Sequence, residues 1–207
     1  ADNCKAVYED NNTPNNYFFV DCANSACSTS TITSLLSVTN IDTPYIVINC
    51  AAGSADCKVT YNDGQLSTPT RNKYVFVDCN SESCDSSTTT YFNNDAEALA
   101  ARATLVCLTS TDCKITYLDG SDGDMIFADC NDATCGDPST LTSPWSSQTA
   151  VETVSISYDS TNNNLYAHII MDTSDQAYWK VSNASTISWS AQTSYAFTAG
   201  DLGQISS

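Results

Sequence analysis

Eleven cysteines are the most reactive feature of this 207-residue sequence, and ten of them fall into closely spaced pairs. Three pairs have the form Cys-x4-Cys, and they are Cys22 and Cys27, Cys79 and Cys84, and Cys130 and Cys135. The other two pairs, Cys50 with Cys57 and Cys107 with Cys113, bracket short turn-like stretches. In an oxidising compartment such spacing favours local disulfides. The sequence therefore predicts five local disulfides and leaves Cys4 without a partner in this chain.

Zinc binding is the alternative for the cysteines, since thiolate sulfur is a preferred zinc ligand. The spacings inside the two hairpin pairs exceed the roughly two to four residues usual between zinc ligands. We therefore favour disulfides, which in turn indicate an extracellular protein, either secreted or on a cell surface.

The stretch LDGSDGD from Leu118 is the best candidate for a calcium site. Asp119, Ser121, Asp122 and Asp124 offer the oxygen ligands that Ca²⁺ prefers, and two glycines permit a tight turn. The stretch lacks the distal Glu of an EF-hand loop, and an ordinary acidic turn is the alternative. No other cofactor is indicated.

Catalytic signatures are weak. His168 is the single histidine and lies in the apolar run YAHIIM, without a nucleophile-elbow motif anywhere in the chain. We expect it to be a structural strand residue and the chain not to be an enzyme. The 24 acidic residues offer candidates for the carboxylate pair of a glycoside hydrolase, but none of them stands out.

Glycans could be attached covalently to this chain or be bound by it. Asn11 and Asn183 begin the N-glycosylation sequons NNT and NAS, both expected in loops. Trp145, Trp179 and Trp189 are expected in the core, but if exposed they could stack on sugar rings or anchor a neighbouring chain.

The elements that position these residues repeat along the chain. The phrases YFFVDCANSAC, YVFVDCNSESC and MIFADCNDATC begin at Tyr17, Tyr74 and Met125, so their first cysteines are 57 and 51 residues apart. Upstream phrases repeat as well: CKAVYED from Cys4, CKVTYND from Cys57 and CKITYLD from Cys113. A period near 50 residues indicates a repeat architecture.

Each unit is predicted to hold four short strands, which in the second unit span about residues 45–50, 57–62, 74–79 and 87–92. The run YVFVDC is largely apolar on both faces, so we expect neighbouring sheets to cover it on both sides. This pattern predicts an all-β fold of tandem four-stranded antiparallel units stacked as a β-propeller, with a β-sandwich or a β-solenoid array as the alternative. The predicted units of the single domain 1–207 are 1–36 (partial), 37–93, 94–142, 143–192 (degenerate) and 193–207 (a lead-in to a further strand).

A Lys–Asp pair recurs in the first three units. Lys5, Lys58 and Lys114 follow the upstream cysteine, and Asp21, Asp78 and Asp129 precede the next one. If the second and third strands form a hairpin, each Lys faces its Asp, and a cross-strand pair of this kind stabilises by about 0.2–1 kcal/mol. In the cysteine-free fourth unit, alignment equates Cys57 with Tyr166 and Cys79 with Ser182, which puts Ala167 and Val181 at the charged positions. The alternative is a ring of Asp side chains lining a ligand channel.

The phrases SYDSTNNNLYAHIIMD and FVDCNSESC resemble the extracellular propeller-type tandem repeats with Cys-x4-Cys loops of large secreted and surface proteins. These are distantly similar to sialidase-like (Asp-box-type) blades, so the resemblance implies a propeller-type surface domain. The blade signature Ser-x-Asp-x-Gly-x-Thr-Trp is absent, and Arg71 and Arg102 are the only arginines, whereas sialidase chemistry uses three. The resemblance therefore implies no sialidase activity.

The net charge of −17, with seven Lys and Arg residues in total, argues against binding to nucleic acid or to an anionic membrane, and no apolar run is long enough to span a bilayer. The leading hypothesis is a non-catalytic structural or adhesive module of a secreted surface protein or filament. A lectin-like carbohydrate-binding propeller is the alternative, and a glycoside hydrolase fragment comes third. We expect other copies of the chain, flanking repeats of a longer chain, or glycans as partners, and self-association when the chain is expressed alone, including dimers through Cys4.

Overall fold

The computed structural model describes the chain in eleven stretches: residues 4–10, 15–24, 26–38, 46–50, 56–64, 72–92, 103–118, 125–136, 140–145, 151–171 and 176–196. Within them the fold is all-β, and the strands form four antiparallel sheets. None of these residues belongs to a helix with the length and apolarity that a membrane crossing requires.

Each sheet is built from strands that are consecutive in the sequence. The first sheet contains β1 (Lys5–Asp10), β2 (Asn15–Cys22) and β3 (Ser30–Val38). The second contains β4 (Ile46–Cys50), β5 (Cys57–Gly64), β6 (Asn72–Cys79) and β7 (Ser87–Phe92). The third contains β8 (Ala103–Thr109), β9 (Asp112–Leu118), β10 (Met125–Cys130) and β11 (Thr140–Trp145). The fourth contains β12 (Val151–Asp159), β13 (Asn164–Met171), β14 (Gln176–Asn183) and β15 (Thr193–Ala196).

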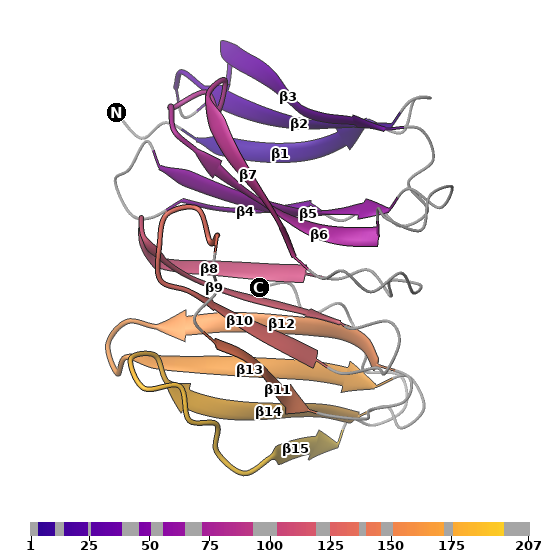
Figure 1. Ribbon diagram of the computed structural model, residues 1–207, viewed down its shortest axis with the longest axis vertical. Helices are drawn as coiled ribbons and strands as arrows, with labels where there is room; N and C mark the ends of the chain where they lie inside the picture. Colours follow the sequence, from indigo (N-terminus) through magenta and orange to yellow (C-terminus); the bar gives the residue numbers. More distant parts are fainter. Residues whose placement is uncertain are drawn as a thin grey trace.

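The four sheets follow one another along the long axis of the molecule (Figure 1). The β1–β3 sheet lies at one end and the β12–β15 sheet at the other, with the two remaining sheets between them. We call the face of a sheet that points towards the next sheet in the chain its front face, and the opposite face its back face.

Strand β6 illustrates how the sequence builds this stack. Successive side chains of a strand point to opposite faces. Tyr74 and Phe76 accordingly pack on the front side with the β8–β11 sheet, while Val75 and Val77 pack on the back side with the β1–β3 sheet. All four are at most 2% exposed, and burying each such side chain stabilises the fold by about 1.5–3 kcal/mol. Coverage on both faces is what the run YVFVDC predicted.

The all-β fold is confirmed, and the second sheet has its four strands within two residues of the predicted bounds. Four-stranded antiparallel units are found in three sheets, and the described part of the first sheet has three strands. The described residues contain no closed ring of sheets, so the propeller arrangement remains a prediction.

Candidate functional site

No metal-binding cluster is assembled in the stretches that the structure describes, where no three His, Cys, Asp or Glu side chains converge. The predicted calcium ligands Asp119, Ser121, Asp122 and Asp124 lie outside the described residues, as does the sequon at Asn11. The features that do recur with defined geometry are disulfide loops, buried ion pairs and contacts between sheets. These form the candidate site.

The three Cys-x4-Cys pairs close tight loops that share one geometry. Each predicted pair is disulfide-bonded, with Cα atoms 4.7, 4.6 and 4.8 Å apart. The second cysteine of each has a positive φ of 47°, 55° or 51°, a left-handed conformation uncommon outside glycine. Its backbone N–H donates a hydrogen bond to the carbonyl three residues earlier, so each loop is closed by both a hydrogen bond and a disulfide.

The other two disulfides join the first two strands of a sheet. Cys50 pairs with Cys57 and Cys107 with Cys113, directly opposite in the register, with Cα atoms 4.1 and 4.0 Å apart. The side-chain oxygen of Asn49 accepts a 3.1 Å hydrogen bond from the Cys107 N–H, which ties one hairpin to the next. All eleven cysteines lie in described residues; ten are paired as predicted, and Cys4 is an exposed free thiol.

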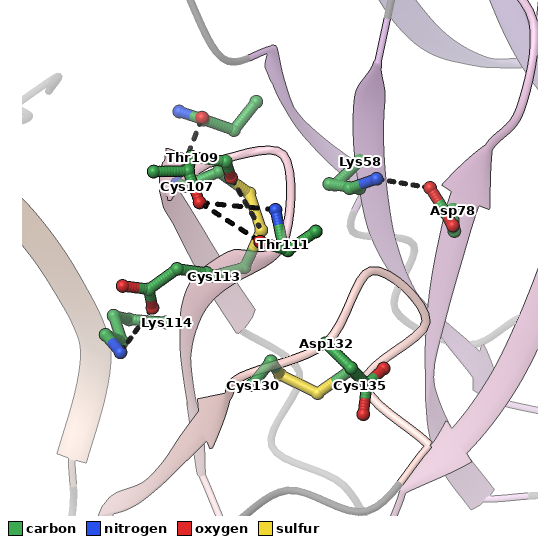
Figure 2. Close-up of a disulfide and its surroundings, with 12 residues drawn as sticks. Lys58, Asp78, Cys107, Thr109, Thr111, Cys113, Lys114, Cys130, Asp132 and Cys135 are labelled. Atoms are coloured by element: carbon green, nitrogen blue, oxygen red, sulfur yellow. Dashed lines mark hydrogen bonds and ion pairs between the residues drawn. A yellow bond between two sulfur atoms is a disulfide. The ribbon is translucent and has the colours of Figure 1, made fainter.

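The Cys-x4-Cys loops of the second and third sheets also bind the preceding sheet. The hydroxyl of Thr33 on β3 donates to the carbonyl of Ser83 at 2.7 Å, and Thr90 on β7 donates to the carbonyl of Thr134 at 2.7 Å. Both carbonyls belong to the residue before the second cysteine of a loop. Figure 2 shows the Cys130–Cys135 loop on the side of its sheet that faces Lys58 and Asp78 of the preceding sheet.

The Lys–Asp pairs lie on the front faces, where the next sheet covers them. Lys58 bonds Asp78 and Lys114 bonds Asp129, with all four residues at most 8% exposed. The pairs occupy opposite register positions, as predicted. Lys114 Nζ also lies 2.5 Å from Asp112 Oδ1, although only Asp129 accepts a well-aligned hydrogen bond from it. Because an unpaired charge in such surroundings is strongly unfavourable, each pair must form as a unit.

The first pair, Lys5 with Asp21, bonds in the same way but lies nearer to solvent. Lys5 Nζ additionally donates to the carbonyl of Glu82 at 3.0 Å, inside the Cys79–Cys84 loop of the next sheet. The lysine thus joins its own strand pair to the following sheet.

The fourth sheet corrects one alignment made from the sequence. Ser182 lies opposite Leu165, as Cys130 lies opposite Cys113, so Leu165 rather than Tyr166 takes the place of the upstream cysteine. The positions of the Lys–Asp pair are therefore held by Tyr166 and Val181, not by Ala167 and Val181. Both charges are still replaced together, but Tyr166 is a larger side chain than the Ala167 of the sequence alignment.

The cysteine-free turn of the fourth sheet keeps one feature of the Cys-x4-Cys loops, a left-handed residue at the position of the second cysteine. Ile187 follows Ser182 by five positions, as the second cysteine of each loop follows the first, and it has a positive φ of 36°. Hydrogen bonds hold this turn in place of a disulfide: Ser188 N–H donates to Ser182 Oγ at 2.6 Å, and Ala184 N–H donates to the Asn163 carbonyl at 2.9 Å. A β-branched residue in this conformation is strained.

The front face of the β12–β15 sheet lies at one end of the stack, and no further sheet packs on it within the described ranges. Its partly exposed side chains include Tyr166, His168, Trp179 and Val181. Trp179 lies opposite Thr193, as Phe19 lies opposite Thr33 and Phe76 opposite Thr90. Thr193, which is exposed, is therefore the equivalent of the threonines that bind a loop carbonyl of the next sheet.

The back face of the β1–β3 sheet lies at the other end. Tyr8 stacks on Phe18 with ring centroids 5.1 Å apart, and Tyr8 and Ile32 are 41% and 56% exposed. The Cys22–Cys27 loop is also uncovered at its second cysteine, whereas the equivalent Cys84 and Cys135 are buried. Surfaces that are interior in the middle sheets are thus on the outside at both ends.

The three tryptophans have different surroundings. Trp145 is 3% exposed and donates a hydrogen bond from Nε1 to Gln192 Oε1 at 3.0 Å. Lys180 Nζ lies over its ring, 5.1 Å from the ring centroid. Trp189 packs edge-on against Phe127 with ring centroids 5.2 Å apart. Trp179 is the one on an end face.

Two further predicted residues lie in the fourth sheet. Burial lowers the pKa of His168, whose neighbours across the sheet are Ser155 and Trp179. Asn183, of the second sequon, is exposed at the end of β14, and its side-chain oxygen accepts a 2.9 Å hydrogen bond from Ser185 N–H. Comparison with known proteins finds no matching family model, curated protein or solved structure.

Proposed function

We propose that this chain is a non-catalytic structural module of a secreted or cell-surface protein that stacks face to face with sheets of its own kind. The observation that supports it most is that no sheet built from the described residues packs on either end face. In the interior of the stack the equivalent faces are buried against a neighbouring sheet and carry apolar clusters. Because the end faces are equivalent to these buried faces, we expect a sheet of the same kind to pack on them.

The two ends are matched to each other. A second copy can place the back face of its β1–β3 sheet, with Tyr8, Phe18 and Ile32, on the Trp179 face of the first. By equivalence with Thr33 and Thr90, the Thr193 hydroxyl would then donate to the carbonyl of Ala26, the residue before Cys27. Each head-to-tail contact occupies one end of each copy and leaves the other end free, so the contacts extend into a filament or close into a ring.

A propeller-like arrangement of the sheets is part of the proposal. The first strands of successive sheets lie close together, β4 near β8 and β8 near β12, as expected for blades that fan out from one side. The resemblance to extracellular propeller-type repeats supports the same arrangement. Five disulfides are consistent with an extracellular location, where such bonds persist.

Sedimentation velocity on a Cys4→Ser chain tests the proposal without interference from the free thiol. We expect concentration-dependent assembly that Trp179→Asp abolishes, because a carboxylate would be buried unpaired in the contact. Tyr91→Asp, which changes a 55% exposed aromatic of an internal sheet, is the matched control and should assemble like the parent. A parent chain that stays monomeric at high concentration, or a Trp179→Asp chain that assembles as before, contradicts the proposal.

A further inference from the structure

Strand β1 has an outer edge that no described strand pairs with, and the repeat shows what belongs there. Lys5 lies opposite Asp21 as Lys58 lies opposite Asp78 and Lys114 opposite Asp129, so β1 is the equivalent of β5 and β9. Both β5 and β9 have a further antiparallel strand on their other side, β4 and β8. In the described residues β1 is instead the edge strand of its sheet.

Cys4 occupies the position at which that outer strand is covalently attached elsewhere. Its carbonyl accepts the Cys22 N–H at 2.9 Å, which continues the β1–β2 register by one residue. The equivalent residues are Cys57, which is disulfide-bonded to Cys50 of β4, and Cys113, which is disulfide-bonded to Cys107 of β8. Both are 0% exposed, whereas Cys4 is exposed.

The partner cysteine is not in this chain, because the other ten cysteines are already paired. A second copy could offer only its own Cys4. We propose that β1 accepts an antiparallel strand from a polypeptide segment outside these 207 residues, with a cysteine opposite Cys4 that forms a disulfide with it.

The register of β4 and β8 specifies the incoming strand. Ile48 lies opposite Val59 and Leu105 opposite Ile115, two positions before the cysteine and on the back face. The equivalent position on β1 is Ala6, which is exposed. The strand therefore follows the pattern apolar-x-apolar-x-Cys, as in Ile46–Cys50, and its first apolar residue would lie beside Tyr8.

Backbone pairing and disulfide formation act together at such an edge. Main-chain hydrogen bonds hold the added strand, as in β-augmentation, and they set the two cysteines directly opposite at a bridging distance. The two thiols lose two protons and two electrons to a disulfide oxidant, which is reduced to two thiols. This inference deepens the proposed function, since it names a segment that would join the module to its neighbour.

A peptide with the sequence of residues 45–50, YIVINC, tests the site when its cysteine carries a thiopyridyl disulfide. Attack by the Cys4 thiolate forms the protein–peptide disulfide and releases thiopyridone, which is measured by absorbance. Since pairing raises the effective concentration of the two sulfurs, we expect YIVINC to react at least about tenfold faster than YIVCNI, which exchanges the Ile and Cys positions. Mass spectrometry should find one peptide per chain, attached at Cys4, and none on Cys4→Ser.

The reaction is measured on the Trp179→Asp chain, so that its result does not depend on contact between end faces. A rate advantage that disappears in denaturant supports a paired strand. Equal rates for the two peptides would show an accessible thiol only and would overturn the inference. The inference would also be overturned if the chains formed Cys4–Cys4 disulfide dimers in preference to reacting with YIVINC.

Discussion

At the scale of single residues, removing one partner of a buried Lys–Asp pair should cost more stability than removing one partner of a surface ion pair. The sequence predicts a cross-strand pair of modest strength, but the front-face position leaves Lys58 and Asp78 at 2% and 4% exposure. Desolvation makes an isolated charge there far more unfavourable than the loss of a surface pair. The fourth sheet replaces both charges at once, with Tyr166 and Val181.

Lys58→Met should destabilise the chain by about 3–5 kcal/mol, because it leaves the Asp78 carboxylate buried without a partner. Lys58→Met combined with Asp78→Val should recover most of that loss. Urea unfolding measures both, and Lys5→Met, at the more exposed pair, is the matched control with a smaller effect. Additive effects of the two substitutions would show that the side chains do not act as a pair.

His168 makes stability depend on pH in a definite direction. Burial lowers its pKa in the folded chain below the ordinary value of 6.5, so the unfolded chain binds the proton more readily. Stability from this residue is therefore complete above that value and decreases as the pH falls through it, until the folded-state pKa is passed. Between about pH 7.5 and 5, His168→Gln should lose less stability than its parent.

The histidine comparison is made in an Ile32→Asp background, which should keep both chains monomeric. Urea midpoints at the two pH values give the result. Parallel losses in the two chains would assign the pH dependence to the carboxylates instead.

At the scale of elements, each unit is a sheet with a turn after its third strand, and the left-handed residue of that turn persists where the cysteines are absent. Ile187 adopts the left-handed conformation of Cys27, Cys84 and Cys135 at the same offset in the strand–turn–strand element. The hydrogen bond from Ser188 N–H to Ser182 Oγ spans this turn in place of the covalent bond. The conformation therefore belongs to the turn and not to the disulfide.

Restoring the cysteines should consequently restore the bond. Ser182→Cys with Ile187→Cys should oxidise spontaneously and stabilise the chain by about 2 kcal/mol, the chain-entropy value for so short a loop, less the lost Ser182 hydrogen bonds. Thermal unfolding of the oxidised variant and of the oxidised parent, which share the five native disulfides, gives the comparison. Persistent free thiols under oxidising conditions would contradict the equivalence of the two turns.

The sequence predicted the structure well in the three units that repeat the cysteines and the Lys–Asp pair, and less well in the fourth unit, which lacks both. Cysteine spacing and the run YVFVDC predicted the disulfide pairs and the strands, because both depend on local chain geometry. The alignment of the fourth unit was one residue off on β13, since Tyr166, Ala167 and His168 offer no charge or cysteine to fix the register. Equally, the depth at which Lys58 is buried depends on the next sheet, which no local pattern describes.

At the scale of the whole molecule, the stack is interior-like at both ends and carries a net charge of −17. Apolar contact favours association of the ends, whereas like charge on two copies opposes it. The balance between the two should respond to salt. Raising the ionic strength from about 0.01 M to 0.15 M shortens the screening length from roughly 30 Å to 8 Å.

Assembly of the Cys4→Ser chain should therefore strengthen with added salt, by contrast with a contact held by opposite charges. Light scattering at fixed protein concentration measures the effect, and the Trp179→Asp chain is the control for non-specific salting-out. Dissociation at the higher ionic strength would mean that ion pairs, rather than apolar faces, join the copies.

The head-to-tail stack is tested most directly by blocking one end at a time. Ile32→Asp removes the β1–β3 back face as a partner, and Trp179→Asp removes the β12–β15 front face, so each chain alone should be monomeric. Mixed in equal amounts in the Cys4→Ser background, they retain one intact end each. Sedimentation equilibrium should then show a one-to-one dimer that does not grow further. A mixture that stays monomeric while the parent assembles, or dimers in either chain alone, would contradict stacking through these two faces.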